Sequence, residues 1–198
     1  MDIMKIINQA ISVLMKPKEA LKKAKNEKVE TMDIILYLGI VGIPTLIGFI
    51  LGYGVIGYEG FYLGASVGAA IVYYIVAIIG IIIFGFLLNA IAPYFKTKQN
   101  KMQALKLVAY SSTPWLLAGI FYFHPSIWFL ATLAGLYGLY ILYIGIPILM
   151  ETPKEQQIPF LIVSIVIYVI IMAVVWQIAW NIWWRISWGS TIPYRWRF

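Results

Sequence analysis

In the segment LKLVAYSSTPWLLAGI, residues 105–120, three consecutive hydroxyl side chains and a proline stand between two apolar runs. The hydrocarbon core of a membrane offers no water, so hydroxyls and freed backbone groups there must find partners inside the protein. Pro114 removes one helical hydrogen bond. Ser111, Ser112 or Thr113 can bond back to the carbonyls nearby or reach a neighbouring helix. The segment therefore predicts a kinked membrane-spanning helix that contacts another helix at the kink.

The composition is that of an integral membrane protein. Hydrophobic residues make up 62% of 198 positions and charged residues 12%, about half of the roughly 25% found in soluble proteins. Apolar runs reach the ~20 residues that a helix needs to cross a bilayer. A chain of this length without a long hydrophilic insert has room for one helical bundle and none for a soluble catalytic domain. The amino end lacks the short apolar core and small-residue site of a cleavable signal peptide, so we expect none.

Five apolar stretches predict an all-α fold of five transmembrane helices. They cover residues 34–56, 61–91, 104–123, 127–150 and 158–181. The second stretch is longer than a bilayer requires, so we expect it to tilt or protrude. The predicted organisation is a cytoplasmic amphipathic and basic segment at 1–32, the five-helix domain at 33–181, and a Trp/Arg-rich interfacial tail at 182–198.

Lysines predict the orientation, because basic loops stay on the cytoplasmic side. The amino segment and the loops after the second and fourth stretches carry twelve of them: Lys5, Lys16, Lys18, Lys22, Lys23, Lys25, Lys28, Lys96, Lys98, Lys101, Lys106 and Lys154. The other side holds three arginines, Arg185, Arg195 and Arg197. We therefore expect a multi-pass cell membrane protein with a cytoplasmic amino terminus and an extracytoplasmic carboxyl terminus.

The amino end predicts a helix that lies in the membrane interface. Its apolar residues follow helical spacing, and at about 14 residues the helix is too short to span; they are Ile3, Ile6, Ile7, Ala10, Ile11 and Leu14. Pro17 ends this helix and can begin a second, basic one at 18–25. The lysines here either only fix the topology or also bind anionic lipids or a protein partner.

The carboxyl end is rich in aromatic residues at helical spacing: Trp176, Trp180, Trp183, Trp184 and Trp188, then Tyr194 and Trp196. Such rings settle at headgroup depth, and arginines can reach phosphates from the same place. We interpret this end as an interfacial anchor. A box that stacks on a ligand or holds a quaternary ammonium group is the alternative.

Residues that carry chemistry are almost absent. The chain has no cysteine, which excludes disulfides and thiolate metal sites, and its one histidine, His124, cannot form a metal cluster alone. His124 falls in a turn about 12 residues from Ser112, some 18 Å along a straight helix, too far for a nucleophile–base pair. We expect no enzyme activity, cofactor, metal site or nucleic-acid partner.

The polar residues at membrane depth form the candidate helix-contact or ligand site: Tyr110, Ser111, Ser112, Thr113 and Pro114, together with Asn89 and Tyr140. Glycines predict close helix packing: Gly48 and Gly52, Gly64 and Gly68, and then Gly135, Gly138 and Gly145. Small residues spaced in this way let backbones approach, within one bundle or in a homo-oligomer.

The chain resembles the Ypt-interacting-protein (Yip) domain family. Five spans, a cytoplasmic amino end and the run from Ala109 to Pro114 carry the resemblance, since eukaryotic members have a GYGxxxP-type motif there and prokaryotic members a YxxxP-like form. The stretch from Leu133 to Gly145 and the loop from Met150 to Lys154 are similar to prokaryotic members. The acidic-aromatic DLYGP-type motif of the family is replaced by Glu30-Thr31-Met32-Asp33. The resemblance covers about residues 15–180.

Eukaryotic members of that family bind Rab-type small GTPases and associate with one another in Golgi and endoplasmic-reticulum membranes. The short amino segment and the abundance of Ile and Lys look prokaryotic, so the resemblance implies the fold more than that role. We expect a non-enzymatic protein of membrane organisation or a protein-interaction scaffold. A channel or carrier for a small neutral or lipid-like solute is the alternative, and a cavity beside Ser111, Thr113, Asn89 and Tyr140 would favour it.

Overall fold

The computed structural model describes residues 2–56, 63–124 and 126–189, and within these ranges it is helical without strands. Five of its helices are long and apolar enough to cross a membrane, which confirms the predicted all-α fold of five spans. A shorter apolar helix, α1 (Ile3–Met15), and the basic helix α2 (Pro17–Asn26) precede them.

The first span is divided into α3 (Thr31–Val41), α4 (Ile43–Phe49) and the π-helical turns η1 (Ile50–Ile56). The second is α5 (Leu63–Ile91), followed by the short 3₁₀ helix η2 (Ala92–Phe95). The third is α6 (Lys101–Ala118), which continues as the 3₁₀ helix η3 (Gly119–Phe123). The fourth and fifth are α7 (Phe129–Leu149) and α8 (Lys154–Gly189).

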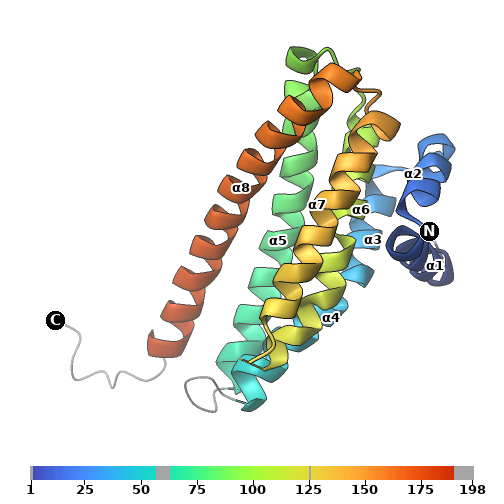
Figure 1. Ribbon diagram of the computed structural model, residues 1–198. Helices are drawn as coiled ribbons and strands as arrows, with labels where there is room; N and C mark the ends of the chain where they lie inside the picture. The colour runs from blue at the N-terminus through green and yellow to red at the C-terminus, as the bar shows by residue number, and fades with distance from the viewer. Residues whose placement is uncertain (1, 57–62, 125, 190–198) are drawn as a thin grey trace.

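Helix α6 lies at the centre of the bundle, where it packs against α3, α4, α5 and α7. It is the most buried of the spans, and α8 is the least buried. Helix α8 packs mainly along α5 and diverges from the other helices toward its carboxyl end (Figure 1). Apolar side chains therefore cover most of the outward surface of α8, as a lipid-facing helix requires.

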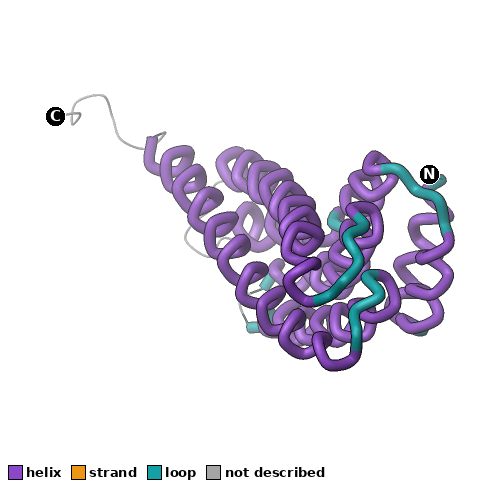
Figure 2. The backbone as a smooth tube through the Cα atoms, turned by 90° about the horizontal axis from the view of Figure 1, so that it is seen from above, coloured by secondary structure: helices purple, strands orange, loops and turns teal. Residues whose placement is uncertain are grey.

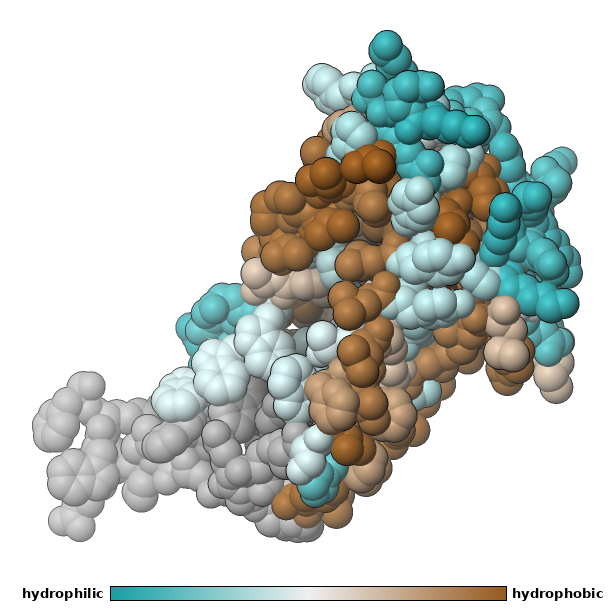
Figure 3. Space-filling view, viewed as in Figure 1, coloured by the Kyte–Doolittle hydropathy of each residue, from teal (hydrophilic) through white to brown (hydrophobic). Residues whose placement is uncertain are grey.

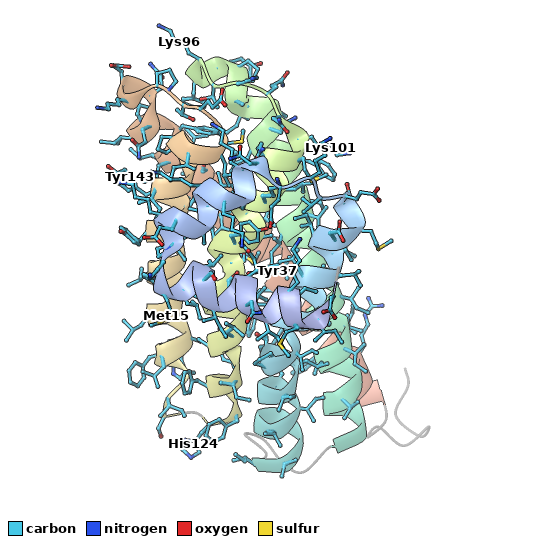
Figure 4. The ribbon with its side chains drawn as sticks, turned by 90° about the vertical axis from the view of Figure 1, so that its right-hand side faces the viewer. Met15, Tyr37, Lys96, Lys101, His124 and Tyr143 are labelled. Atoms are coloured by element: carbon cyan, nitrogen blue, oxygen red, sulfur yellow. The ribbon has the colours of Figure 1, made fainter. Side chains whose placement is uncertain are left out.

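The two amino-terminal helices form a separate layer on the side of the bundle opposite α8, as the view from above shows (Figure 2). Figure 4 shows α1 lying across the spans and ending at Met15. Buried side chains anchor both helices: Ile6, Ala10 and Val13 from α1, with Ala20, Leu21 and Ala24 from α2. The layer is thus part of the hydrophobic core and not a loose tail.

In the view of Figure 3, polar surface gathers at the upper end of the molecule and along the right-hand flank, where the amino-terminal helices lie. Glu151, in the loop between α7 and α8, lies 2.8 Å from the ammonium of Lys25 and 3.8 Å from that of Lys98. These ion pairs bring the amino segment and the two basic loops to the same end, and Figure 4 shows His124 at the opposite end from Lys96. Which end faces the cytoplasm stays a prediction.

Lowering the pH is expected to remove the stabilising effect of Glu151. The ammonium of Lys25, by hydrogen bond and charge, and that of Lys98 hold the pKa of this carboxyl below its usual 4.5. A carboxyl whose pKa is lower in the folded state stabilises the fold above its unfolded pKa, and the effect is lost as the pH falls through the folded pKa. Thermal unfolding of the wild type and of Glu151→Gln should therefore differ at neutral pH and converge in acid. A difference that persists in acid, or that Glu155→Gln reproduces, would contradict this.

The structure confirms some predicted boundaries and corrects others. The third span ends at Phe123 as predicted, since α6 continues through Pro114 to Ala118 and then as η3; the kink at Pro114 stays a prediction. The fifth span ends at Ile182, next to the predicted 181, but its helix α8 continues to Gly189. The loop predicted to contain Lys101 and Lys106 ends earlier, because α6 begins at Lys101. The turn at 57–60 and the tail at 190–198 lie outside the described residues.

Candidate functional site

Helix α6 carries its polar side chains on two faces. Lys106, Tyr110 and Thr113 are spaced four and three residues apart, so they share one face of the helix. Ser111 and Ser112 point to the other side, toward α7 and α8. The α6 residues predicted as one candidate site therefore lie on two different faces of this helix.

On the first face a buried polar cluster joins α6 to α3. The hydroxyls of Tyr37 and Thr113 are 2.7 Å apart, and the rings of Tyr37 and Tyr110 meet edge to face with centroids 5.2 Å apart. All three side chains are almost completely buried. Aromatic pairs of this geometry contribute about 0.5–1.5 kcal/mol beyond the area they bury. The cluster therefore fixes how the first span packs on the third.

The hydroxyls around Pro114 bond back to their own helix, one of the two arrangements that the sequence predicts. Ser111 donates to the carbonyl of Leu107 at 2.7 Å and Ser112 to that of Val108 at 2.8 Å. Thr113 lies 3.2 Å from the carbonyl of Ala109. Since all these partners lie within α6, the run Ser111–Thr113 needs no water at membrane depth.

On the second face Ser111 and Ser112 line a cavity of about 170 Å³ between α5, α6, α7 and α8. Its walls are Phe84, Ser111, Ser112, Trp115, Thr132, Gly135, Leu136, Gly138, Leu139, Leu142, Ile165, Tyr168 and Val169. Neither Thr113, Asn89 nor Tyr140 is among them. The predicted set of polar residues thus does not converge on one cavity.

Asn89 and Tyr140 lie away from this cavity. The backbone carbonyl of Asn89 accepts a hydrogen bond of 3.2 Å from Gln99 in the loop before α6, so it belongs to the polar end of the bundle. Tyr140 is half exposed on α7 and stacks on Tyr137, with ring centroids 5.8 Å apart. Neither residue contributes to the polar groups around Pro114.

Lys106 is the polar residue that the sequence analysis misplaced. It is not a loop lysine: its side chain is 1% exposed on α6, and its ammonium donates to the carbonyls of Ala24 at 2.7 Å and Glu27 at 2.6 Å. These carbonyls lie at the carboxyl end of α2, where carbonyls lack helical partners and the helix dipole favours a cation. The shared helix face with Tyr110 and Thr113 is the sequence signal that could have indicated burial.

Two further side chains of the bundle bond to carbonyls of the amino segment. The amide of Gln103 donates to the carbonyl of Lys25 at 2.8 Å, and the hydroxyl of Tyr137 donates to that of Leu14 at 2.7 Å. With Lys106, these residues hold the carboxyl ends of both α1 and α2. The amino segment is therefore docked by hydrogen bonds as well as by apolar burial.

Docking gives α1 three faces instead of the two predicted from the sequence. Ile6, Gln9, Ala10 and Val13 face the bundle. The exposed polar residues Lys5, Asn8, Ser12 and Lys16 form a second face. The third face is apolar and exposed, and it consists of Ile3, Met4, Ile7, Ile11 and Met15. We call this third face the apolar row of α1.

The remaining sequence candidates have local roles in the structure. His124 is exposed in the turn before α7, and its Nδ1 accepts the backbone N–H of Ser126 at 3.2 Å. Trp176, Trp180 and Trp184 are each about half exposed on α8. The side chains of Trp183 and Trp188, and the residues Tyr194 to Arg197, lie outside the described part of the chain.

Three of the glycines predicted for helix packing make close contacts within this chain. Gly138 lies against the carbonyl of Ser111, and Gly145 against the side chain of Leu107. Gly48 lies against the backbone of Gly119 and Ile120 in η3. A homo-oligomer stays a prediction.

Comparison with known proteins finds one family and related inner membrane proteins. The Yip1 domain family matches residues 11–177. The inner membrane protein YohC of Escherichia coli K12, and that of Escherichia coli O6:H1, are each 28% identical to the chain over 119 residues. That alignment covers 59% of this chain and 60% of the relative, less than two thirds of its length. No solved structure matches the chain.

Proposed function

Because this chain belongs to the Yip1 domain family, we propose that it organises the membrane as a non-enzymatic scaffold whose helix α1 inserts into one leaflet. Its five apolar helices and its similarity to inner membrane proteins make it a multi-pass cell membrane protein. The proposed scaffold role and the insertion of α1 into one leaflet are supported by one observation, the apolar row of α1. This row lies between a polar face and a face docked on the bundle.

Such a three-faced helix fits the boundary between protein, water and acyl chains. An amphipathic helix in the interface buries its apolar face ~5–10 Å into the boundary between headgroups and acyl chains. Docking at the carboxyl ends of α1 and α2 holds the helix beside the bundle, so the apolar row inserts without an additional cost of ordering the segment. Material added to one leaflet only is expected to favour curvature.

The exposed lysines of α2 supply the electrostatic part of the proposal. Lys18, Lys22 and Lys23 are exposed on the polar side of the amino layer. Each lysine near an anionic leaflet contributes on the order of 1 kcal/mol. With basic loops on the cytoplasmic side, the amino terminus would be cytoplasmic, the carboxyl terminus extracytoplasmic, and the inner leaflet the one that α1 enters.

Replacing the apolar row is expected to abolish the effect on vesicles. The triple variant Ile3→Ser, Ile7→Ser, Ile11→Ser keeps the residues that dock α1 and replaces three of the five side chains of its apolar row. Reconstituted into vesicles of phosphatidylcholine and phosphatidylglycerol, the wild type should give smaller vesicles than this variant. Cryo-electron microscopy of the vesicles measures their size.

The matched control is Asn8→Ala with Ser12→Ala, on the polar face of the same helix, and it should behave as the wild type. Deletion of residues 1–16 should reproduce the triple variant. Equal vesicle sizes for the wild type, the triple variant and the deletion would contradict a role of α1 in curvature.

The channel or carrier has one observation in its favour, the cavity beside Ser111 and Ser112. A path for a polar solute needs polar groups that the solute can bond to. Both serine hydroxyls already donate to carbonyls of α6. The scaffold is therefore better supported than a path for a polar solute.

A further inference from the structure

We propose that the cavity between α7 and α8 holds a short stretch of one acyl chain of a bilayer phospholipid, which enters sideways from the membrane. This assignment goes beyond the scaffold function and does not depend on α1. It rests on where the cavity opens, on the state of its polar groups and on its size.

Exposed residues of α7 and α8 line the cavity, so it reaches the outer surface of the bundle between these two helices. Leu136 on α7 and Val169 on α8 line it and are more than half exposed. Phe84, Ser112 and Leu142 line it as well and are buried. The exposed pair forms a rim on the outer surface and the buried residues form a floor against α5 and α6. In a bilayer, the molecules in contact with such a rim are acyl chains.

The lining holds few polar side chains, namely Ser111, Ser112 and Trp115 on α6, Thr132 on α7 and Tyr168 on α8. Ser111 and Ser112 donate their protons to carbonyls of their own helix, and the indole N–H of Trp115 donates to the hydroxyl of Tyr122 at 3.2 Å. A headgroup or a polar solute would leave its hydration shell without receiving these donors in return. Hydrocarbon has no hydration shell to lose, so this mainly apolar lining favours an acyl chain over a headgroup or a polar solute.

The size of the cavity suits a short stretch of such a chain. Its volume is about 170 Å³, and an apolar cavity of ~150 Å³ in another protein stays dry and binds benzene.

Two glycines of α7, Gly135 and Gly138, line the cavity and leave different amounts of space for a larger side chain. A side chain at Gly138 would meet the carbonyl of Ser111, whereas at Gly135 the nearest atom to an added Cβ is Trp115 Cδ1 at 3.9 Å. Gly135 therefore keeps space open that a larger residue could fill.

Photolabelling from within the bilayer tests the assignment. The full chain is reconstituted in vesicles of phosphatidylcholine and phosphatidylglycerol that contain a trace of phosphatidylcholine with a mid-chain diazirine. After irradiation, mass spectrometry maps the adducts. We expect adducts on the floor residues Phe84, Ser112 and Leu142, in addition to the outward residues Ile162 and Ile170 of α8, which any surrounding lipid reaches.

The variant Gly135→Leu fills the cavity and should reduce the floor adducts by more than half while leaving those on Ile162 and Ile170 unchanged. Leu139→Phe, a second cavity-filling change, should act in the same way if Gly135→Leu fails to fold. The matched control is Leu133→Phe, since Leu133 lies on the exposed surface of α7 and outside the cavity. It should leave the floor adducts at the wild-type level.

Three results would overturn the assignment. The first is a wild-type floor without adducts while the outward residues are labelled. The second is floor labelling that persists in the folded cavity-filling variants. The third is labelling of the floor by a water-soluble carbene precursor, because it would show a solvated cavity. None of these results depends on vesicle size, so failure here and failure of the scaffold function are distinguishable.

Discussion

Replacing Gly48 by alanine is expected to destabilise the bundle by about 3 kcal/mol, the upper end of the range for overpacked sites. An added Cβ would meet the carbonyl oxygen of Gly119 and would lie 2.9 Å from that of Ile120 and 3.0 Å from its Cα. These atoms belong to the backbone of η3, so no side chain can rotate away. The span must separate from η3 or the 3₁₀ turns must shift.

The same crossing holds a hydrogen bond that a shift would break. The hydroxyl of Thr45, one turn before Gly48, donates to the carbonyl of Leu116 at 2.6 Å. Carbonyls in the last turn of a helix lack regular partners, and both Thr45 and Gly119 are buried. Loss of this bond adds to the cost of overpacking.

Gly39→Ala is the matched control, nine residues earlier in the same span. The nearest atom to its added Cβ is Tyr74 Oη at 3.8 Å, an ordinary contact. Alanine in a helix is favoured over glycine by roughly 0.5–1 kcal/mol, so this variant should be as stable as the wild type or more stable. Unfolding in mixed micelles with a denaturing detergent measures both. Equal stability of Gly48→Ala and Gly39→Ala would contradict the close crossing.

Replacing Lys106 by methionine is expected to loosen the carboxyl end of α2 on the bundle, although Gln103 still bonds to the carbonyl of Lys25. The change leaves the carbonyls of Ala24 and Glu27 without their charged donor, and hydrogen bonds to charged groups contribute about 1.5–3 kcal/mol each. Helix α2 buries only three side chains, all alanine or leucine. Apolar contact is therefore too small to hold its carboxyl end alone.

Limited trypsin digestion in micelles measures this loosening, because α2 carries several lysines that docking protects. Lys106→Met should be cut between residues 16 and 28 faster than the wild type. Lys101→Met is the matched control, since Lys101 is exposed on the same helix, with its ammonium 4.8 Å from the ring centroid of Phe86. Equal digestion of the two variants would show that Lys106 does not dock the segment.

Hydropathy alone predicts the five spans, because each must satisfy its backbone within itself and cover itself with apolar residues. The structure confirms their number and shifts their ends by a few residues. Lys106 shows where this kind of prediction fails. A lysine between two apolar runs is ordinarily assigned to a loop, and only a neighbouring helix end can supply the carbonyls that let it be buried.

The candidate site likewise shows that contacts within one helix are predictable from the sequence and contacts between helices are not. The sequence of α6 predicts the back-bonded hydroxyls of Ser111 and Ser112, since their partners lie four residues away on the same helix. It does not predict that Thr113 faces Tyr37, 76 residues away, or that Asn89 and Tyr140 lie apart from the cavity. Those facts depend on how the spans rotate about their own axes.

The sequence by itself thus determined that this protein is a five-helix membrane bundle with an amphipathic first helix. Those features depend on composition and on spacing within single helices. Only the tertiary structure decided which faces meet: which row of α1 stays exposed, what Lys106 bonds to, and where a cavity opens. The physical reason is that nearly uniform apolar helices have little difference between their faces. Their rotation is set by a few glycine contacts and hydrogen bonds between segments far apart in the chain.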